Sequence, residues 1–445
     1  MRILITGGGT GGHLYPALAV AEALKASSPG LEVLFVGSER GIEKEQVPEA
    51  GFAFRALEVV GFPRRPGLAS IRAVTSFIRA CRSARDLVRE YAPDVVFSTG
   101  GYASSPVVVG AWLARVPIVL QEQNSVPGLT NRVASRLAAE VHLAFPGARA
   151  HFPKRGHLKL SGNPLRAQVL GGSRGRAARL FRLEEEVTTV LVLGGSQGAH
   201  SINEAMIAAL PRFAGREDIQ FLIQTGNLDH ERMLEAAKVA NVKTWVRRFV
   251  GNMGDAYSLS DLVLCRAGAM TISELCACGL PSILVPYPHA TGNHQQMNAE
   301  LVRDAGGGVI LTDAELTGAR VAEEIETLLA DRPRLREMSV NALRLARPDA
   351  AATIVKSLAR YLPGLALPEP LPALRRADDG PRRGGNRGGD GRTWDRSNRP
   401  RPSGPPRGGD SGDRPNSRPG PAPTSGGPRP PAGARRRAPE RGATA

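Results

Sequence analysis

Long apolar runs are missing from this chain of 445 residues. A membrane-spanning helix needs about 18 consecutive apolar residues, and the longest candidate, residues 106–120, is interrupted by Arg115 and Pro117. Only three apolar residues stand between Arg2 and the first glycine, so no secretory signal peptide is expected. These absences predict a cytoplasmic protein without a transmembrane span.

Cysteines are few, and none stands in a metal-binding pattern. Of Cys81, Cys265, Cys276 and Cys278, only the last two are close together, and no second pair follows at zinc spacing. We expect buried free thiols in a reducing compartment. The chain also lacks a DxD motif and a tight group of His, Asp and Glu. We therefore expect neither a metal site nor a cofactor.

Large apolar side chains are almost absent from residues 375–445. These 71 residues hold 13 Pro, 15 Gly and 17 Arg against 7 acidic residues, a net charge of +10. The whole chain carries +16, so residues 1–374 carry only +6. Such a composition predicts a disordered tail. The basic pI belongs mostly to this tail and is no evidence that the rest of the chain binds nucleic acid.

Two glycine-rich turns stand out in the rest of the chain. Residues 2–6 predict a short buried strand, GGGTGGH follows at 7–13, and residues 14–24 show helical apolar periodicity. The same order recurs with VLVL at 190–193, GGSQGAH at 194–200 and a helical stretch from Ile202. Such turns let backbone N–H groups and the positive end of a helix approach a phosphate. Two units predict two α/β domains facing one anionic ligand.

Short apolar strands alternate with helices in both halves. Further strands are expected at 31–36, 94–97, 118–120, 221–224, 244–249, 262–265 and 282–285, and helices at 68–89 and 350–362. This alternation predicts an α/β protein with two Rossmann-like, doubly wound parallel sheets, followed by the disordered tail. The loops after the strands of such a sheet meet at one edge, where ligands bind.

The expected domains follow from this pattern. An N-terminal domain at 1–166 is joined to a C-terminal domain at 189–345 by a polar, basic linker at 167–188. Helix 350–362 is expected to pack back on the first domain, before the tail at 375–445.

Two segments are candidates for chemistry. In CRAGAMTISE at 265–274 a strand ends and a helix begins, so its amides could hold a diphosphate and Glu274 could accept two ribose hydroxyl hydrogens. A helix-start acid that caps the helix fits the spacing of Glu274 equally well. His13, beside the first glycine turn, is a candidate general base. The GxGxxG pattern of residues 7–12, with Glu39 downstream, also leaves a nicotinamide-dependent oxidoreductase open.

The expected helix at 68–89 has an apolar stripe in basic surroundings. The stripe contains Ile71, Val74, Phe77, Ile78 and Cys81, and the basic residues are Arg64, Arg65, Arg72, Arg79, Arg82, Arg85 and Arg89. One interpretation is a helix that packs on its own sheet with solvated arginines. The other is a patch that binds an anionic lipid surface.

In their order along the chain, these segments resemble the peptidoglycan N-acetylglucosaminyltransferases of glycosyltransferase family 28. The resemblance covers roughly residues 1–362 and rests on GGGTGGH at 7–13, GGYAS at 100–104, EQN at 122–124, GNPLR at 162–166, GGSQGA at 194–199, CRAGAMTISE at 265–274 and HQQMNA at 294–299. It implies the two-domain GT-B fold. It also implies inverting transfer of N-acetylglucosamine from its UDP donor (UDP-GlcNAc) to undecaprenyl-diphospho-N-acetylmuramoyl-pentapeptide (lipid I), which yields lipid II.

The resemblance also implies roles for single residues. Those expected to line the cleft or bind the donor are Thr10, Gly11, Gly12, Asn124, Arg166, Ser196, Val250, Ala269, Met270, Thr271, Ile272, Ser273, Glu274 and Gln295. Within this set, Ser196 contacts the diphosphate, Val250 offers its backbone to uracil, and Gln295 contacts the sugar hydroxyls. Glu274 binds the ribose. His13 is the candidate base and Glu122 the alternative. Gln121 and Asn293 stand where the family commonly has His and Asp.

The implied location is the cytoplasmic face of the plasma (inner) membrane, with the protein bound peripherally. The implied partners are UDP-GlcNAc, lipid I, an anionic membrane surface and other proteins of cell-wall synthesis. The tail has no counterpart in the family core, and its Arg-Gly-Gly sequences at 383–385, 387–389 and 407–409 leave an RNA-binding protein as the alternative from another class. Anionic lipid is the preferred partner of the tail.

Overall fold

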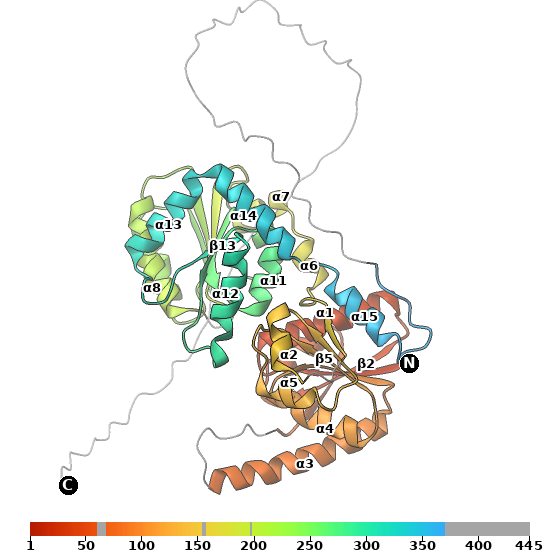
Figure 1. Ribbon diagram of the computed structural model, residues 1–445. Coiled ribbons are helices and arrows are strands. Elements are labelled where there is room, and N and C mark those ends of the chain that lie inside the picture. Colours follow the sequence, from red (N-terminus) through yellow and green to blue (C-terminus); the bar gives the residue numbers. More distant parts are fainter. Residues whose placement is uncertain (60–67, 154–156, 196–197, 370–445) are drawn as a thin grey trace, which may run out of the picture. The chain divides into compact units, whose positions relative to one another are not determined.

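Two parallel β-sheets carry the described part of the chain, and helices cover both faces of each sheet (Figure 1). The structure is a computed structural model and describes residues 1–59, 68–153, 157–195 and 198–369. The expected α/β class with two doubly wound, Rossmann-like sheets is confirmed. The tail expected at 375–445 lies outside the described residues.

The first sheet has the strand order β3-β2-β1-β4-β5-β6-β7, and all its neighbouring strands run parallel. Its described strands are β1 (Arg2–Gly7), β2 (Glu32–Ser38), β3 (Ala53–Leu57), β4 (Val95–Gly100), β5 (Ile118–Glu122), β6 (Glu140–Leu143) and β7 (Leu158–Leu160). Its helices are α1 (Gly11–Ser27), α2 (Glu43–Glu49), α3 (Leu68–Tyr91), α4 (Ser105–Leu113), α5 (Leu129–Ala134) and α15 (Ala350–Leu358). Two 3₁₀ helices lie at Tyr102–Ser104 and Pro146–His151.

The second sheet has the order β10-β9-β8-β11-β12-β13 and is also parallel throughout. Its described strands are β8 (Thr188–Leu193), β9 (Ile219–Gln224), β10 (Thr244–Arg247), β11 (Leu262–Arg266), β12 (Ser282–Val285) and β13 (Gly308–Ile310). Its helices are α8 (His200–Ala209), α9 (His230–Val239), α10 (Met253–Leu259), α11 (Ala269–Ala277), α12 (His294–Asp304), α13 (Gly318–Ala330) and α14 (Arg332–Leu345). Two 3₁₀ helices lie at Leu210–Phe213 and Thr291–Asn293.

Alternate residues of the central strands fill two separate cores. Ile3 and Ile5 of β1 pack among residues of α1 and α15, whereas Leu4 packs with residues of α3 and α4 on the other face. Both faces are buried, so these strands are continuous apolar runs rather than alternating ones. This is why the central strands were visible in the sequence.

The segment at 167–188, expected to be a linker, instead contains α6 (Ala167–Leu170) and α7 (Arg174–Phe181). Its arginines are not simply solvated. Arg174 donates to the Leu259 carbonyl at 2.6 Å and pairs with Asp261 at 3.2 Å, and Arg176 pairs with Asp255. The polar composition therefore belongs to a segment that packs against α10. Two expected ends were also too long, since β10 ends at Arg247 and α15 at Leu358.

Helix α15 packs against α1 of the first sheet, although it follows the whole second sheet in the chain (Figure 1). Ile354, Val355 and Leu358 are fully buried in the core around β1 and α1. A polar network adds to this contact, because Glu140 of β6 accepts hydrogen bonds from Lys159 at 2.6 Å, from Arg360 at 2.9 Å and from Ser357.

His142 of β6 lies fully buried beside this network, and both of its ring nitrogens lack a hydrogen-bond partner in the described structure. Burial lowers the pKa of His142 to about 4. The folded state therefore favours the neutral ring, so its contribution to the free energy of unfolding is complete above the unfolded pKa of about 6.5. We expect this contribution to fall, by at most ~1.4 kcal/mol per pH unit, as the pH decreases from about 6.5 towards 4.

The matching experiment compares thermal unfolding of the wild type and His142→Leu at about pH 7 and pH 5. The drop in Tm on acidification should be smaller in His142→Leu, which has no ring to protonate. The exposed His157 supplies the control, because His157→Leu should keep the drop of the wild type. An equal drop in all three proteins would contradict the prediction.

Candidate active site

The order of strands reverses at one point in each sheet, between β1 and β4 and between β8 and β11. Ligands of such sheets bind at these points, outside the carboxyl ends of the strands. The first glycine turn follows β1, the second follows β8, and α11 starts directly after β11. The sequence-predicted segments therefore stand where each sheet can bind a ligand.

The first glycine turn packs closely on the loop after β4. Gly101 has φ +89°, and a Cβ atom there would lie 2.4 Å from the Gly8 carbonyl oxygen, so both conformation and space require glycine. The N–H of Gly9 donates to the buried carboxylate of Glu43 at 2.9 Å, which also accepts from the amide and hydroxyl of Ser38. Glu39, the acid proposed from the sequence, lies exposed. The carboxylate of Glu43 occupies the N–H of Gly9 and would repel the diphosphate of a ligand. The second sheet is therefore the better candidate for binding a diphosphate.

His13 lies in the first turn of α1 with its ring partly buried against the loop after β4. Its Nδ1 is 3.0 Å from the Thr99 carbonyl oxygen and 3.0 Å from Oε1 of Gln123. Both partners are acceptors, so Nδ1 carries the hydrogen of the neutral ring and Nε2 carries the lone pair. Burial lowers the pKa of His13. A neutral ring with Nε2 as acceptor is the form that a general base needs.

Glu122, the alternative base, ends β5 and is buried. Its Oε1 accepts from the backbone N–H of Asn124 at 2.9 Å, and its Oε2 accepts from Nδ2 of Asn131 at 2.9 Å. Burial raises the pKa of Glu122. The carboxylate thus holds the loop after β5, and with it Asn124, one of the residues expected to reach the donor.

Arg166, expected to reach the donor from the first domain, is held by α1 in this structure. Its Nη2 lies 2.6 Å and its Nε 2.9 Å from Oε1 of Glu22, in a two-pronged contact. Such a fork is a strong form of ion pair. Contact of the guanidinium with an anionic donor would compete with Glu22, which was not visible in the sequence.

Helix α11 begins at Ala269, immediately after Gly268. Ala269 and Ile272 are buried in the core, so these two residues can offer a ligand only their backbone, whereas Met270, Thr271, Ser273 and Glu274 are partly exposed. The N–H groups of this first turn have no intrahelical partner and form a suitable anion site.

The carboxylate of Glu274 accepts a hydrogen bond from the Tyr257 hydroxyl of α10 at 2.7 Å. Burial raises the pKa of Glu274 to about 7. Its partner in this structure is therefore a tyrosine on another helix rather than the start of its own helix, which disfavours the capping interpretation.

Five further predicted residues have described positions, and a sixth does not. The N–H of Val250 donates to Oε1 of Gln224 at 2.9 Å, so recognition of uracil there would fall to the carbonyl oxygen. Gln295, in the first turn of α12, accepts from the Tyr287 N–H at 2.9 Å through Oε1. Ser196 lies outside the described residues. Thr10 and Gly12 are exposed, and Gly11 is partly exposed, at the start of α1.

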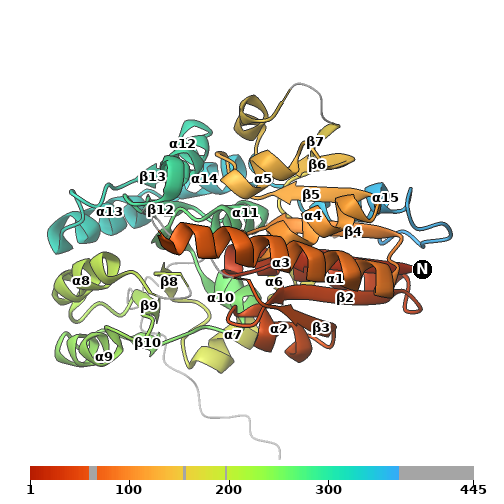
Figure 2. The same cartoon turned by 90° about the horizontal axis from the view of Figure 1, so that it is seen from below.

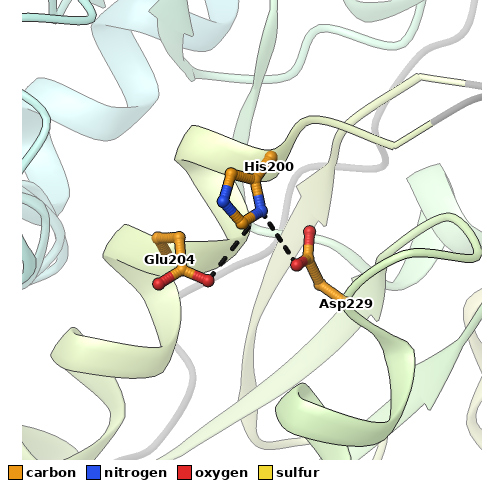
Figure 3. Close-up of side chains that lie close together, drawn as sticks. All are labelled: His200, Glu204 and Asp229. Atoms are coloured by element: carbon orange, nitrogen blue, oxygen red, sulfur yellow. Dashed lines mark hydrogen bonds and ion pairs between the residues drawn. The ribbon is translucent and has the colours of Figure 1, made fainter. Parts of the chain in front are cut away.

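Near the second glycine turn, His200, Glu204 and Asp229 point toward one another, and their possible ligand atoms lie within 4.8 Å (Figure 3). The sequence showed no such group because Asp229 is 29 residues from His200. Nδ1 of His200 is 2.9 Å from Asp229, and Arg232 pairs with Glu204 and lies 3.6 Å from Asp229. Arg232 thus supplies the positive charge that a metal would bring, and the group ties α8 to the start of α9.

Asn163 is the main site residue that sequence reasoning passed over. It is 2 % exposed, donates to Oγ of Ser273 at 2.9 Å and to the Ala269 carbonyl at 3.3 Å, and accepts from Nε2 of Gln121 at 2.9 Å. A second contact of this kind joins other elements: the N–H of Ser125, in the loop after β5, donates to Oδ1 of Asn298 on α12 at 3.2 Å. The GNPLR block marked the segment of Asn163, but nothing in it identified the partner.

Family models match both halves of the chain. The glycosyltransferase family 28 N-terminal domain matches residues 3–143, and the glycosyltransferase family 28 C-terminal domain matches residues 189–354. The chain is also similar to proteins named UDP-N-acetylglucosamine--N-acetylmuramyl-(pentapeptide) pyrophosphoryl-undecaprenol N-acetylglucosamine transferase. The one from Moorella thermoacetica is 42% identical over 364 residues, 80% of this chain and 98% of the relative. That from Desulforamulus reducens is 37% identical over 369 residues, 82% of this chain and 99% of the relative.

Solved structures agree with the sequence relatives. The crystal structure of Acinetobacter baumannii MurG superposes with a TM-score of 0.65 at 30% identity, covering 81% of this chain and 99% of that chain. The UDP-GlcNAc 2-epimerase of Neisseria meningitidis, bound to UDP-GlcNAc, has a TM-score of 0.59 at 12% identity, covering 81% of this chain and 100% of that chain, and shares the fold. The GT-B architecture implied by the resemblance is confirmed. This chain belongs to glycosyltransferase family 28.

Proposed function

We propose that this chain is an inverting glycosyltransferase that moves N-acetylglucosamine from UDP-GlcNAc to lipid I and forms lipid II. The names of the relatives from Moorella thermoacetica and Desulforamulus reducens support this reaction. The observation that carries the proposal is His13, whose Nδ1 is bound by two carbonyl oxygens, so that Nε2 is left as the proton acceptor beside the glycine turn.

The donor is held by the second sheet. The N–H groups at the start of α11 and the positive end of its dipole hold the diphosphate, together with Ser196. Glu274 accepts hydrogen bonds from the ribose hydroxyls. The backbone of Val250 contacts uracil, and Gln295 contacts the sugar hydroxyls. Asn124 and Arg166 reach the donor from the first sheet, and Thr10, Gly11 and Gly12 line the space between donor and acceptor.

The reaction is a displacement at the sugar carbon. The acceptor hydroxyl oxygen forms the new bond to that carbon as the bond to the diphosphate oxygen breaks, and the electron pair of the broken bond leaves with UDP. The hydroxyl proton passes to Nε2 of His13. Positioning and charge stabilisation supply most of the acceleration, and the base adds about 10²–10⁴-fold.

The direct test is UDP release from UDP-GlcNAc with and without a water-soluble lipid I analogue. We expect release that depends on the acceptor. Binding of NAD in place of UDP would favour an oxidoreductase. Salt-dependent RNA binding that survives removal of residues 1–362 would favour the RNA-binding alternative.

The lipid-linked acceptor requires contact with a membrane surface, and α3 supports this part of the proposal. Among the described residues, no helix is long and apolar enough to cross a membrane. Helix α3, the long orange helix, lies beside α4 (Figures 1 and 2). Its Ala80 and Ala84 are buried, whereas Val74 and Ile78 are 47% and 46% exposed. The apolar stripe is thus wider than packing requires, and the exposed Arg79 and Arg82 suit anionic lipid.

Replacing Val74 and Ile78 together with serine should lower binding to anionic vesicles by about tenfold, because two exposed apolar side chains are removed from the membrane contact. Vesicle co-sedimentation measures the effect. Turnover on the water-soluble acceptor should persist. Val239 of α9, 75% exposed on the second sheet, is the matched control, and Val239→Ser should bind vesicles like the wild type. Equal loss of turnover on soluble and lipid-bound acceptors would contradict a membrane role.

A further inference from the structure

Three buried side-chain amides form a continuous chain between His13 and helix α11. They belong to Gln123, Gln121 and Asn163, which are 1%, 0% and 2% exposed. Water therefore does not compete for their hydrogen bonds, and each amide must find its partners within the protein.

The amide of Gln123 has its orientation fixed by its neighbours. Its Nε2 donates to the carbonyl oxygens of Thr99 at 2.8 Å and of Gln121 at 3.1 Å, and to the side-chain oxygen of Gln121. Only oxygen atoms surround this nitrogen in these contacts. Its Oε1 must then face Nδ1 of His13, at 3.0 Å. The oxygen can accept a hydrogen bond only if Nδ1 carries the hydrogen.

The same direction continues to the donor helix. Nε2 of Gln121 donates to Oδ1 of Asn163 at 2.9 Å. Nδ2 of Asn163 donates to Oγ of Ser273 at 2.9 Å, and that hydroxyl donates to the Ala269 carbonyl at 2.9 Å. Along these side-chain links each group donates to the next one in the direction of α11, while the amide nitrogens also donate to backbone carbonyls such as those of Thr99 and Gln123. Reversing one amide would place N–H groups against N–H groups in a buried site, where unsatisfied polar groups are strongly unfavourable.

We propose that Gln123, Gln121 and Asn163 are positioning residues that hold His13 in the Nδ1–H tautomer and couple its ring to the first turn of the donor helix α11. The consequence for turnover rests on the proposed function, in which Nε2 of His13 is the base. The assignment of the tautomer does not rest on the proposed function. A histidine at position 121 would fit the same scheme, because an imidazole also has one donor and one acceptor on opposite edges.

The experiment reads the tautomer directly, by ¹⁵N NMR of the full-length protein labelled at histidine, with the His13 signals assigned by their loss in His13→Asn. The wild type should show Nδ1–H and an unprotonated Nε2. In Gln121→Met, of similar volume but without the amide, Gln123 loses the side-chain oxygen of Gln121 and keeps two backbone acceptors, so the Nε2–H form should rise to a detectable minority while the Thr99 carbonyl still favours Nδ1–H. The kcat on the soluble acceptor should fall about tenfold, with little change in the donor KM. Gln121→His should restore both readouts.

Two more variants complete the design. Gln220, a buried amide on β9 that donates to the Glu184 carbonyl, is the control, and Gln220→Met should leave the His13 tautomer and kcat unchanged. If Gln121→Met does not fold, Asn163→Leu interrupts the chain one link further along.

The outcomes separate the two ideas. A wild-type His13 in the Nε2–H form, or an unchanged tautomer in a folded Gln121→Met or Asn163→Leu protein, would overturn the proposal. A changed tautomer with unchanged kcat would support the positioning chain and remove His13 as the base.

Discussion

Replacing His13 with alanine is expected to lower kcat by about 10²–10⁴-fold while the donor affinity stays within about threefold. A base acts only as the proton leaves the acceptor hydroxyl, so its loss affects the transition state more than the bound donor. Burial lowers the pKa of His13 below its ordinary value of 6.5. The neutral base form therefore persists below pH 6.5, and the acidic limb of kcat/KM should lie below that value and disappear in His13→Ala.

Steady-state UDP release and donor titration give the two numbers. His157→Ala is the control, because this exposed histidine lies on the loop before β7 and has no role in the proposed site. A near-normal kcat in His13→Ala would remove it as the base. Glu122 would then be the next residue to replace, although its carboxylate is occupied by Asn124 and Asn131.

Glu274→Gln is expected to weaken binding of UDP-GlcNAc by about 10–100-fold, because a charged acceptor of two ribose hydroxyls becomes a neutral one. The pKa of Glu274 is raised to about 7, with burial as the main cause. Only the ionised carboxylate accepts both hydroxyl hydrogens. Donor affinity of the wild type should therefore increase as the pH rises through about 7, and this increase should be absent in Glu274→Gln.

Calorimetric titration with UDP between about pH 6 and pH 8 measures this dependence. Tyr257→Phe is the companion variant. Without the hydroxyl that lowers the pKa of Glu274, the increase in affinity should move to higher pH. Glu235, exposed on α9, provides the control substitution to glutamine. Donor affinity that is equal in wild type and Glu274→Gln would exclude a ribose contact.

Most interior strands could be predicted from the sequence, and so could the edge strand β10, whereas the edge strands β3, β7 and β13 could not. All residues of β8 are buried, so it is a plain apolar run. At the edges, β3 and β7 are mostly exposed or half-buried, and their sequences AFRAL and LKL carry little apolar signal. The segment at 167–188 was misjudged because two of its arginines, Arg174 and Arg176, form ion pairs within the fold.

The motifs of the site were visible, but the contacts that orient them were not. One partner of His13 is a backbone carbonyl 86 residues away, which no side-chain pattern can reveal. The ion pair of Arg166 joins residues 144 positions apart, and the bond from Asn163 to Ser273 joins residues 110 apart. Such pairs depend on which elements the tertiary fold brings together, so the spacing of residues in the sequence carries no information about them.

The return of α15 to the first sheet sets an order for synthesis on the ribosome. Residues 1–143 leave the ribosome first, yet the apolar surface around β1 and α1 is covered by Ile354, Val355 and Leu358, which leave it only after the whole second sheet. Domains generally fold as units during translation, the earlier one first. Here the earlier one stays incomplete until the later one has been made, so a nascent chain paused within the second domain carries an uncovered apolar surface for chaperones to bind.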